Sequence, residues 1–260
     1  MLTVSTVNVN GVRAAAGKGL LDWLAAGAAD VVCLQETRAT RAQLPELDGW
    51  HLAFAESAVA GRNGVAVLSR SRPEQVRTGF GVAEFDGSGR YVEVVLPGIV
   101  VGSVYLPKGD AGTPRQAEKE RFMAGFLPYL AELRDKATAD GREVLVCGDW
   151  NIAHTEADLK AWRANLHHSG FLPQERAWLD RLYAAGFVDV VRALRPGAAG
   201  PYTWWSYRGR AYDNDAGWRI DLHVATPGLA ERARAVVVER ADSYATRWSD
   251  HAPVTVRYDT

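Results

Sequence analysis

The chain has 260 residues, of which 47% are hydrophobic and 23% are charged, and it contains no low-complexity tract. This composition predicts a globular protein with a large buried core and excludes an intrinsically disordered chain. The net charge of −1 excludes a protein that coats nucleic acid through bulk positive charge, so a polyanion would have to be bound by a local group of basic residues.

The sequence carries no pattern typical of export or membrane insertion. The start, Met1 to Val7, lacks a basic stretch followed by a long apolar run, and no later segment reaches the ~20 apolar residues of a membrane span. We therefore expect a cytoplasmic protein without a membrane partner. Cys33 and Cys147 each lie in an apolar run and are expected to be reduced thiols in the core.

The first half of the chain predicts mainly strands. Leu2 to Val9 alternates as a strand, and Gly19 to Ala26 has helical spacing with Leu20, Leu21 and Leu24 on one face. The other strands predicted here are Asp30 to Gln35, Gly64 to Ser69, Tyr91 to Leu96 and Ile99 to Tyr105. The turn residues Pro97 and Gly98 predict that the last two strands form a hairpin.

The second half alternates helices with strands. Helices are predicted over Glu118 to Ala139, with an apolar stripe, and over Trp178 to Ala185. Strands are predicted at Glu143 to Gly148, around Tyr202, and at Arg219 to Ala225, Val236 to Val238 and Val254 to Val256. Because no stretch resembles a linker, we expect a single domain over residues 1–260, built from two packed sheets with outer helices.

Polar residues follow or adjoin many of these strands, where functional residues of α/β proteins collect. They are Asn8 and Asn10, Glu36, Tyr105, Asp149 and Asn151, Asp221, and the pair Asp250-His251. Each also has a structural interpretation, such as a loop former, a half-buried ring or an Asx turn between Asp149 and Asn151. The Asp-His pair places an acid beside an imidazole, which fits catalysis near neutral pH but also a structural histidine.

Several motifs together resemble one enzyme family. They are Val7-Asn8-Val9-Asn10-Gly11-Val12-Arg13, Leu34-Gln35-Glu36-Thr37, Tyr105-Leu106-Pro107, Gly148-Asp149-Trp150-Asn151-Ile152-Ala153-His154, Ser169-Gly170-Phe171-Leu172-Pro173, Tyr202-Thr203-Trp204-Trp205-Ser206-Tyr207-Arg208, Gly217-Trp218-Arg219-Ile220-Asp221 and Ser249-Asp250-His251-Ala252-Pro253. In this order, the set resembles exonuclease III, a family of abasic-site endonucleases in the endonuclease/exonuclease/phosphatase superfamily. The resemblance implies a four-layer α/β sandwich of two mixed β-sheets flanked by helices, as in DNase I-like proteins.

The resemblance also implies a metal site. Glu36 would be the principal ligand of Mg²⁺, for which Mn²⁺ could substitute, and Asn8, Asn10 and Asp250 are the further candidates. A carboxylate oxygen is the kind of hard ligand that Mg²⁺ prefers.

The catalytic residues implied by the resemblance surround a scissile phosphate. His251 would contact this phosphate and be oriented by Asp221 rather than by its neighbour Asp250. Asp149 would activate water or protonate the leaving oxygen, Asn151 would position the phosphate, and Tyr105 would donate a hydrogen bond. Which of Asp149, Tyr105 and His251 handles each proton stays open.

Residues 202–221 interleave aromatic and arginine side chains, which fits either a core or a nucleic-acid surface. By resemblance, Trp204, Trp218 and Ile220 would line a pocket for a base-less deoxyribose, and Arg208 would wedge into the helix. Backbone contacts are expected from Arg90, Lys108, Arg115, Lys160 and Arg163. Residues 108–120 match no family segment.

The implied function is a Mg²⁺-dependent DNA repair phosphodiesterase acting as a monomer on double-stranded DNA. It would incise 5′ to abasic sites and act on 3′ ends as a 3′→5′ exonuclease and 3′-phosphatase, in a balance that the sequence leaves open. Two alternatives remain: a superfamily phosphoesterase acting on a lipid or inositol phosphate, and a catalytically silent protein that binds damaged DNA.

Overall fold

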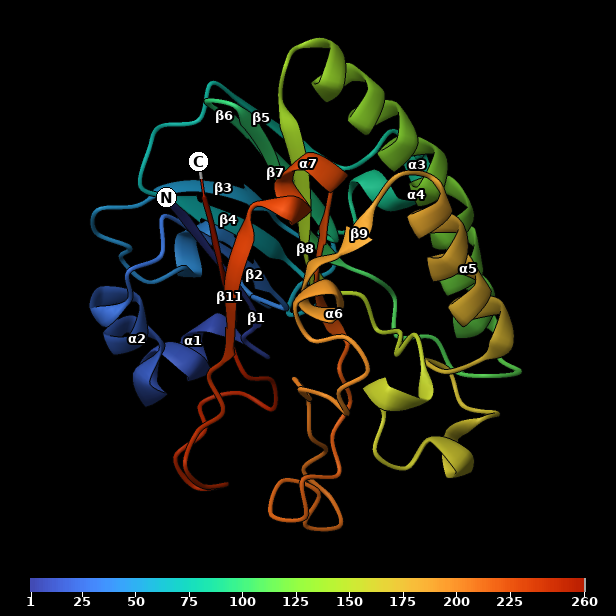
Figure 1. Ribbon diagram of the computed structural model, residues 1–260. Helices are drawn as coiled ribbons and strands as arrows, with labels where there is room; N and C mark the ends of the chain where they lie inside the picture. The colour runs from blue at the N-terminus through green and yellow to red at the C-terminus, as the bar shows by residue number, and fades with distance from the viewer. Residues whose placement is uncertain (260) are drawn as a thin grey trace.

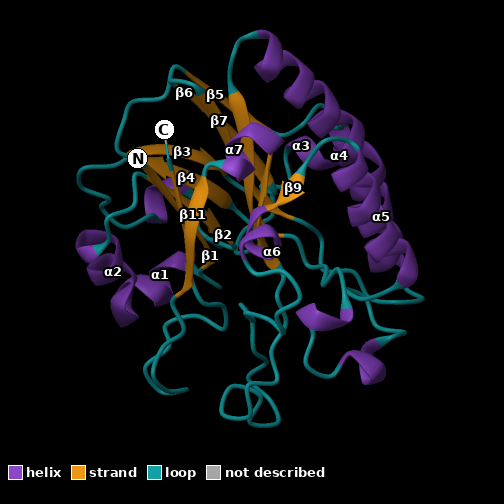
Figure 2. Ribbon diagram, in the orientation of Figure 1, coloured by secondary structure: helices purple, strands orange, loops and turns teal. Residues whose placement is uncertain are grey.

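The computed structural model describes residues 1–259 and contains two six-stranded mixed sheets packed face to face, with helices on both outer faces (Figures 1 and 2). The first sheet has the order β11 (Ala233–Val238), β12 (Val254–Tyr258), β1 (Leu2–Asn8), β2 (Val31–Gln35), β4 (Val65–Ser69) and β3 (His51–Ala55). The second has the order β5 (Gln75–Thr78), β6 (Tyr91–Leu96), β7 (Ile99–Tyr105), β8 (Glu143–Asp149), β10 (Asp221–Ala225) and β9 (Val188–Asp189). The predicted four-layer sandwich is confirmed.

Helical segments cover the sheets and connect their strands. The α-helices are α1 (Val12–Ala15), α2 (Leu21–Ala26), α3 (Ala83–Asp86), α4 (Pro114–Ala139), α5 (Pro173–Ala184), α6 (Val190–Leu194) and α7 (Pro227–Glu231). A π-helical turn, η1 (Ala16–Leu20), joins α1 to α2, and short 3₁₀ turns are η2 (Arg41–Gln43), η3 (Glu156–Asp158) and η4 (Trp162–Asn165). Among residues 1–259, none of these helices is long and apolar enough to cross a bilayer.

Consecutive side chains of a strand point to opposite faces of its sheet, which divides the core into layers. In β2, Cys33 points between the sheets, where it lies in one apolar cluster with Val101 and Cys147 of the second sheet. The next residue, Leu34, belongs to the opposite cluster, together with Leu24 of α2. Strands buried on both faces need apolar residues at consecutive positions, which explains the unbroken apolar runs in the sequence.

The long helix α4 covers the outer face of the second sheet together with α5. Phe122 and Phe126 of α4 and Trp178 of α5 are buried in the same cluster. The helix begins earlier than predicted because the Thr113 side chain accepts a hydrogen bond from the Arg115 backbone N–H and Pro114 occupies the first helical position.

The hairpin of β6 and β7 is confirmed, whereas other predicted elements differ. No strand forms around Tyr202 in the described chain, where Trp204 makes only isolated bridges to Trp218 and His251. The predicted helix from Gly19 begins instead at α1, and Leu21 is exposed. Strands β3, β5 and β9 were missed, and all three lie at the edge of a sheet, where β5 is fully exposed and β9 has only two residues.

The functional loops meet at one end of the sandwich. Strands β1, β2, β7 and β8 finish at this end, and β10 and β12 begin there because they run antiparallel to β8 and β1. The two termini lie at the opposite end, where Leu2 pairs with Tyr258 (Figure 1).

Candidate active site

Strand register places three predicted catalytic residues side by side. Asp149 at the end of β8 is the direct partner of Tyr105 on β7 and of Asp221 on β10. The first sheet contributes Asn8, whose side-chain amide donates to Glu36 and to Asp149, at 2.9 Å in each case. Asn8 therefore connects carboxylates that belong to the two sheets.

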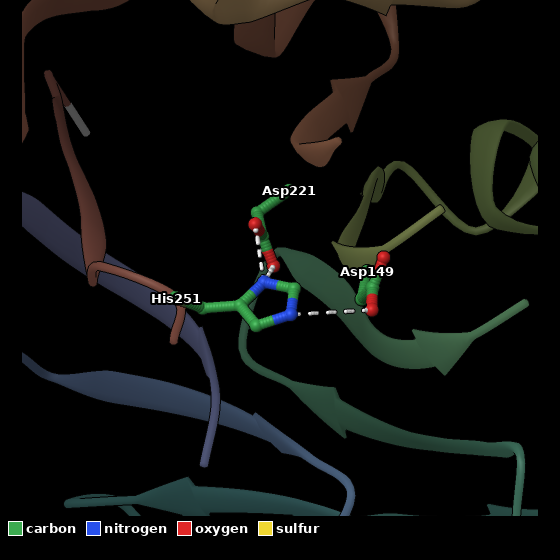
Figure 3. A group of neighbouring side chains, drawn as sticks. All are labelled: Asp149, Asp221 and His251. Carbon is green, nitrogen blue, oxygen red and sulfur yellow. Dashed lines mark hydrogen bonds and ion pairs between the residues drawn. The ribbon is translucent and has the colours of Figure 1, made fainter. Parts of the chain in front are cut away.

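His251 lies between two buried aspartates (Figure 3). Its Nδ1 is 2.8 Å from Asp221 Oδ2, and its Nε2 is 3.8 Å from Asp149 Oδ2. Burial opposes charging of the ring, but Asp221 outweighs burial and, with Asp149, raises the pKa of His251 to about 10. The imidazolium form therefore predominates at neutral pH. The expected pairing of His251 with Asp221 is present.

Asp250, the sequence neighbour of His251, has other partners. Its Oδ1 accepts a hydrogen bond from the Asn10 side chain at 2.8 Å, and its Oδ2 accepts from the Trp204 indole at 3.0 Å. These two hydrogen bonds direct the Asp250 carboxylate to Asn10 and Trp204 and leave Asp221 as the partner of His251 Nδ1. Asp250 instead fixes Trp204 at the pocket edge.

Asp149 is the acid most perturbed by its surroundings. Burial raises its pKa to about 7, His251 opposes the shift, and Asp221 adds to it. Asp149 Oδ1 also accepts the Asn151 backbone N–H at 2.9 Å, so the Asx turn expected as a structural alternative is present as well. A carboxyl group with a pKa near neutrality can both accept and return a proton.

Tyr105 keeps its phenolic proton. Burial raises the pKa of Tyr105 well above its usual value, and the charges of Glu36 and Asp149 raise it further. Its ring is covered by the Arg90 guanidinium, 4.9 Å from the ring centroid, and Arg90 also donates to the Tyr105 carbonyl. Arg90 thus supports Tyr105 from behind, and its predicted contact with a DNA backbone stays a prediction.

Glu36 remains a carboxylate. Burial opposes its ionisation, but the hydrogen bond from Asn8 and the charge of Arg38 lower the pKa of Glu36 below its usual value. The Arg38 guanidinium binds Glu36 Oε2 and lines the pocket, a role that was not predicted. The signal in the sequence was a basic residue two positions after the predicted metal ligand.

The backbone is strained at several of these positions. Asn10, Glu36 and Asn151 have φ values of 47°, 50° and 50°, in the left-handed region that non-glycine residues rarely occupy. Asp149 follows Gly148, where an added Cβ would lie 2.0 Å from the Val104 carbonyl oxygen. The loops are therefore held in conformations that local preferences alone would not select.

These side chains border a cavity of about 250 Å³. Its lining consists of Asn10, Glu36, Arg38, Tyr105, Lys108, Asp149, Asn151, Ser169, Gly170, Trp204, Trp218, Ile220, Asp250 and His251. The predicted pocket residues Trp204, Trp218 and Ile220 are thus together. Asn8 and Asp221 stand behind this lining, and Arg208 lies outside it on an exposed loop. A larger hollow beside Trp23 and Trp50 lacks these strand-end carboxylates.

The donor set fits a hard divalent cation. Glu36 offers a carboxylate to the cavity and already holds a cationic group, Arg38, which an ion would replace or join. Asp149, Asp221 and His251 also have ligand atoms within 4.8 Å of one another. We favour Glu36 as the ligand over this cluster, because His251 and Asp221 satisfy each other and a protonated imidazole cannot bind a metal.

A buried ion pair supports the pocket loops from behind. Lys119 Nζ lies 2.7 Å from Glu175 Oε1, both side chains have 0% exposure, and Lys119 also donates to the Asn151 carbonyl at 2.9 Å. Glu175 accepts from the backbone N–H groups of Gly170 and Leu172. The pair therefore connects α4 and α5 to two loops of the cavity, and sequence reasoning did not identify it.

Residues 202–221 were expected to form either core or a nucleic-acid surface, and Arg219 belongs to the core. It is 1% exposed and binds Asp158 and Asp189. Because it lies between Trp218 and Ile220 in sequence, it anchors the pocket wall from inside. Of the other candidate backbone contacts, Lys108 lines the pocket, and Arg115, Lys160 and Arg163 are exposed.

The fold and the site together define a class of protein: phosphoester hydrolases that place an imidazolium, a perturbed carboxyl group and a second, ionised carboxylate at one end of a four-layer sandwich. The chain belongs to the Endonuclease/Exonuclease/phosphatase family, whose model matches residues 5–251. This membership confirms the predicted superfamily and hydrolase class.

Individual members of this family show which enzymes the chain is similar to. The chain is 37% identical to the exodeoxyribonuclease of Bacillus subtilis over 95% of both sequences. Its structure is similar to an AP endonuclease from Archaeoglobus fulgidus, with a TM-score of 0.90, 30% identity and coverage of 100% of both chains. A 3′ phosphatase from Neisseria, bound to a product DNA hairpin, is similar with the same TM-score, identity and coverage. The predicted relation to exonuclease III and AP endonucleases is confirmed.

Proposed function

We propose that this protein is a Mg²⁺-dependent DNA repair phosphodiesterase that incises duplex DNA 5′ to abasic sites and trims 3′ ends as an exonuclease and phosphatase. The observation that carries the proposal is the position of the Asp149–His251–Asp221 group, at a small cavity walled by Trp204 and Trp218. Relatives named as an exodeoxyribonuclease, an AP endonuclease and a 3′ phosphatase support this substrate class.

His251 binds and polarises the scissile phosphate. Its Nδ1 proton is held by Asp221, and its Nε2 faces the cavity on the side of Asp149. As an imidazolium, it donates a hydrogen bond to a phosphoryl oxygen and stabilises the negative charge that grows there in the transition state.

Asp149 transfers protons beside this phosphate, and Tyr105 donates a hydrogen bond to it. As a carboxylate, Asp149 accepts a proton from the attacking water, and as an acid, it can protonate the departing 3′ oxygen. The Tyr105 hydroxyl stays protonated and donates to the phosphate. Asn151 is fixed by Asp149 and by the Leu106 carbonyl, which keeps its amide oriented at the cavity.

Glu36 would hold Mg²⁺, or Mn²⁺ in its place, with Asn10 and Asp250 nearby. The bound ion supplies Lewis-acid charge relief on the phosphate. Asn8 is already engaged in orienting Glu36 and Asp149, which favours a positioning role for this residue over direct ligation.

The cavity favours a nucleotide without its base. Trp204 and Trp218 form two walls, and their ring centroids are 6.2 Å apart at 79°. A space of about 250 Å³ that must also hold the phosphate groups leaves little room for a base. Extrusion also costs least where pairing is already lost.

The test uses a duplex with one tetrahydrofuran abasic analogue, with Mg²⁺ or EDTA. We expect wild type to cut 5′ to the lesion only with Mg²⁺, and Glu36→Ala and His251→Ala to lose about 10²-fold or more in kcat. Glu132→Ala, on an exposed position of α4, is the matched control. Calorimetric titration of Mg²⁺ should show weaker binding to Glu36→Ala but not to Glu132→Ala. Cutting that persists in EDTA would refute the proposal.

We extend the proposal to the organisation of the protein. The apolar cluster between the sheets contains residues from Val4 to Tyr258, which supports one domain over residues 1–260. A monomer in the cytoplasm, acting on abasic sites and 3′ ends of double-stranded DNA, is part of the same proposal, and sedimentation with and without DNA tests the monomer.

A further inference from the structure

Two loops beside the cavity, residues 206–216 and 240–248, carry aromatic and basic side chains that the mechanism does not use. Tyr207 and Tyr244 are 53% and 46% exposed, and they are the aromatic members among the exposed large hydrophobic side chains of the described chain. Their ring centroids are 6.2 Å apart at 86°. Together with Arg247, we call them the tyrosine–arginine cluster. Large rings in contact at the surface expose area that a partner can cover.

Arg247 occupies the centre of this cluster. Its guanidinium carbon is 4.3 Å from the Tyr207 ring centroid and 4.2 Å from that of Tyr244, and its Nη1 donates to the Trp205 carbonyl at 3.2 Å. Its Nε and Nη2 are buried without a hydrogen-bond partner, and no ion pair within residues 1–259 includes Arg247. The aromatic rings therefore hold a positive charge that no carboxylate neutralises. This combination suits a flat, electron-rich ring attached to an anionic backbone.

The tyrosine–arginine cluster continues directly from the cavity. Tyr207 follows the wall residue Trp204 by three positions, and Arg247 precedes Asp250 by three. The Trp205 backbone N–H donates to the Asp250 carbonyl at 3.1 Å, which ties the two loops together. Both loops extend from the same end of the sandwich (Figure 1). A DNA strand that leaves the cavity past Asp250 would therefore reach the tyrosine–arginine cluster.

Exposed basic residues lie beside the path that this DNA strand would follow. Trp248 packs on Trp23 of α2 with a centroid distance of 5.9 Å, which brings residues 240–248 against the segment that carries the exposed residues Arg13 and Lys18. Arg208 is exposed on the other loop. Since the net charge of the chain is only −1, such local groups must supply the attraction for a polyanion.

We infer that the tyrosine–arginine cluster is a second DNA subsite, which stacks an unpaired nucleobase of the strand that runs from the cavity past Asp250. This inference rests on the proposed function, because it assumes that a DNA strand occupies the cavity. The ring of Tyr244 supplies the stacking surface, and Arg247 orients both rings and attracts the backbone. The subsite favours substrates with single-stranded or frayed DNA next to the lesion or end.

The test measures DNA binding in EDTA by fluorescence anisotropy. The probes are a blunt duplex with one abasic analogue and two versions extended by single-stranded DNA, one on the 5′ side of the lesion and one on the 3′ side, each with 2-aminopurine in the extension. We expect Tyr244→Ala and Arg247→Met to weaken binding of one extended probe about 10-fold, equivalent to about 1.4 kcal/mol. Tyr244→Phe, which keeps the ring, should bind like wild type and retain the change in 2-aminopurine fluorescence.

Other outcomes overturn the inference. Equal binding of Tyr244→Ala and wild type to both extended probes would show that no base stacks there. An equal loss on the blunt duplex, or a loss in Tyr244→Phe, would show a structural role for the loop. Cleavage of the blunt duplex with Mg²⁺ is measured separately. Wild type that binds the extended probes as expected but cannot cut would refute the proposed function and leave the subsite standing.

Discussion

At the scale of single residues, the site depends on which carboxylate reaches which partner. Either Asp250 or Asp221 could have formed the ion pair that orients His251, and these two acids differ in their surroundings. Asp221 is fully buried and also accepts from the Thr203 hydroxyl at 2.6 Å, whereas Asp250 faces the cavity beside Asn10. A buried carboxylate acts on an imidazole more strongly than a solvated one. This explains why the pKa of His251 is raised so far.

The first prediction concerns Asp221→Asn. The pKa of His251 is raised to about 10 mainly by Asp221, so wild type keeps the imidazolium until the pH approaches that value. Without the carboxylate, the pKa falls and the proton is lost at a lower pH. We expect kcat/KM on an abasic duplex to fall about 10²-fold at pH 7.5 and further at pH 9. A pH profile from 6 to 10 measures this, with circular dichroism as the folding control. An unchanged alkaline limb would contradict the assignment.

At the scale of elements, loops with little regular structure are positioned by the helices behind them. The segment that enters α5 contributes Gly170, whose backbone N–H is held by Glu175. Gly170 has φ +95°, and an added Cβ would lie 3.0 Å from the Trp218 ring and 3.2 Å from the Asn151 carbonyl. The spacing between the pocket wall and the loop after β8 therefore depends on the absence of a side chain at this position.

The second prediction compares Gly170→Ala with Gly141→Ala. Gly141 also has positive φ, +68°, but an added Cβ meets no atom within 4 Å. Both variants should lose about 1–2 kcal/mol of stability from the left-handed backbone, as measured by denaturant unfolding. Only Gly170→Ala should displace Trp218 and raise KM for the abasic duplex about 10-fold. The same KM in both variants would show that the contact does not shape the pocket.

At the scale of the whole molecule, polar contacts as well as apolar packing join the two sheets. His223 of β10 lies in the second sheet, and its partners belong to β12 of the first: its Nε2 is 3.1 Å from the Val254 carbonyl, and its Nδ1 is 3.1 Å from the Tyr258 hydroxyl. The ring has 0% exposure. Burial lowers the pKa of His223 to about 4, and the neighbouring hydrogen bond and Asp189 do not compensate.

The third prediction concerns the way in which proton binding by His223 changes the free energy of unfolding. An unfolded histidine has a pKa of about 6.5, so between that value and about 4 the unfolded chain binds a proton that the folded chain does not. Stability contributed by the neutral ring is present above about pH 6.5 and is lost as the pH falls. Between pH 7 and 5, this group should account for about 2 kcal/mol of unfolding free energy.

Urea unfolding at both pH values compares wild type with His223→Gln, which cannot titrate. The difference in stability between pH 7 and 5 should be smaller in this variant by about that amount. His51→Gln, on an exposed position of β3, is the control and should keep the wild-type difference. An identical pH dependence in wild type and His223→Gln would show that the buried ring is protonated without cost.

The sequence by itself determined the family and the fold class, and it named most of the residues that the structure brings together at the candidate site. It could do so because apolar alternation marks the strands, and because Glu36, Asp149 and His251 lie in short motifs next to strands, where the sheets bring them together. The start of α4 at Thr113 was missed although its cap is local, whereas edge strands such as β5 were missed because they depend on a neighbouring strand.

Only the tertiary structure decided which charges are buried together. In the sequence, Arg90, Lys119 and Arg219 look like ordinary basic residues. In the structure, Lys119 and Arg219 are buried inside the protein and Arg90 is partly buried, and they support Tyr105 and the loops of the pocket. A basic side chain is stable there only with aromatic, carboxylate or carbonyl partners, and these come from distant segments. Burial and long-range pairing are properties of the packed sheets, so a local pattern cannot encode them.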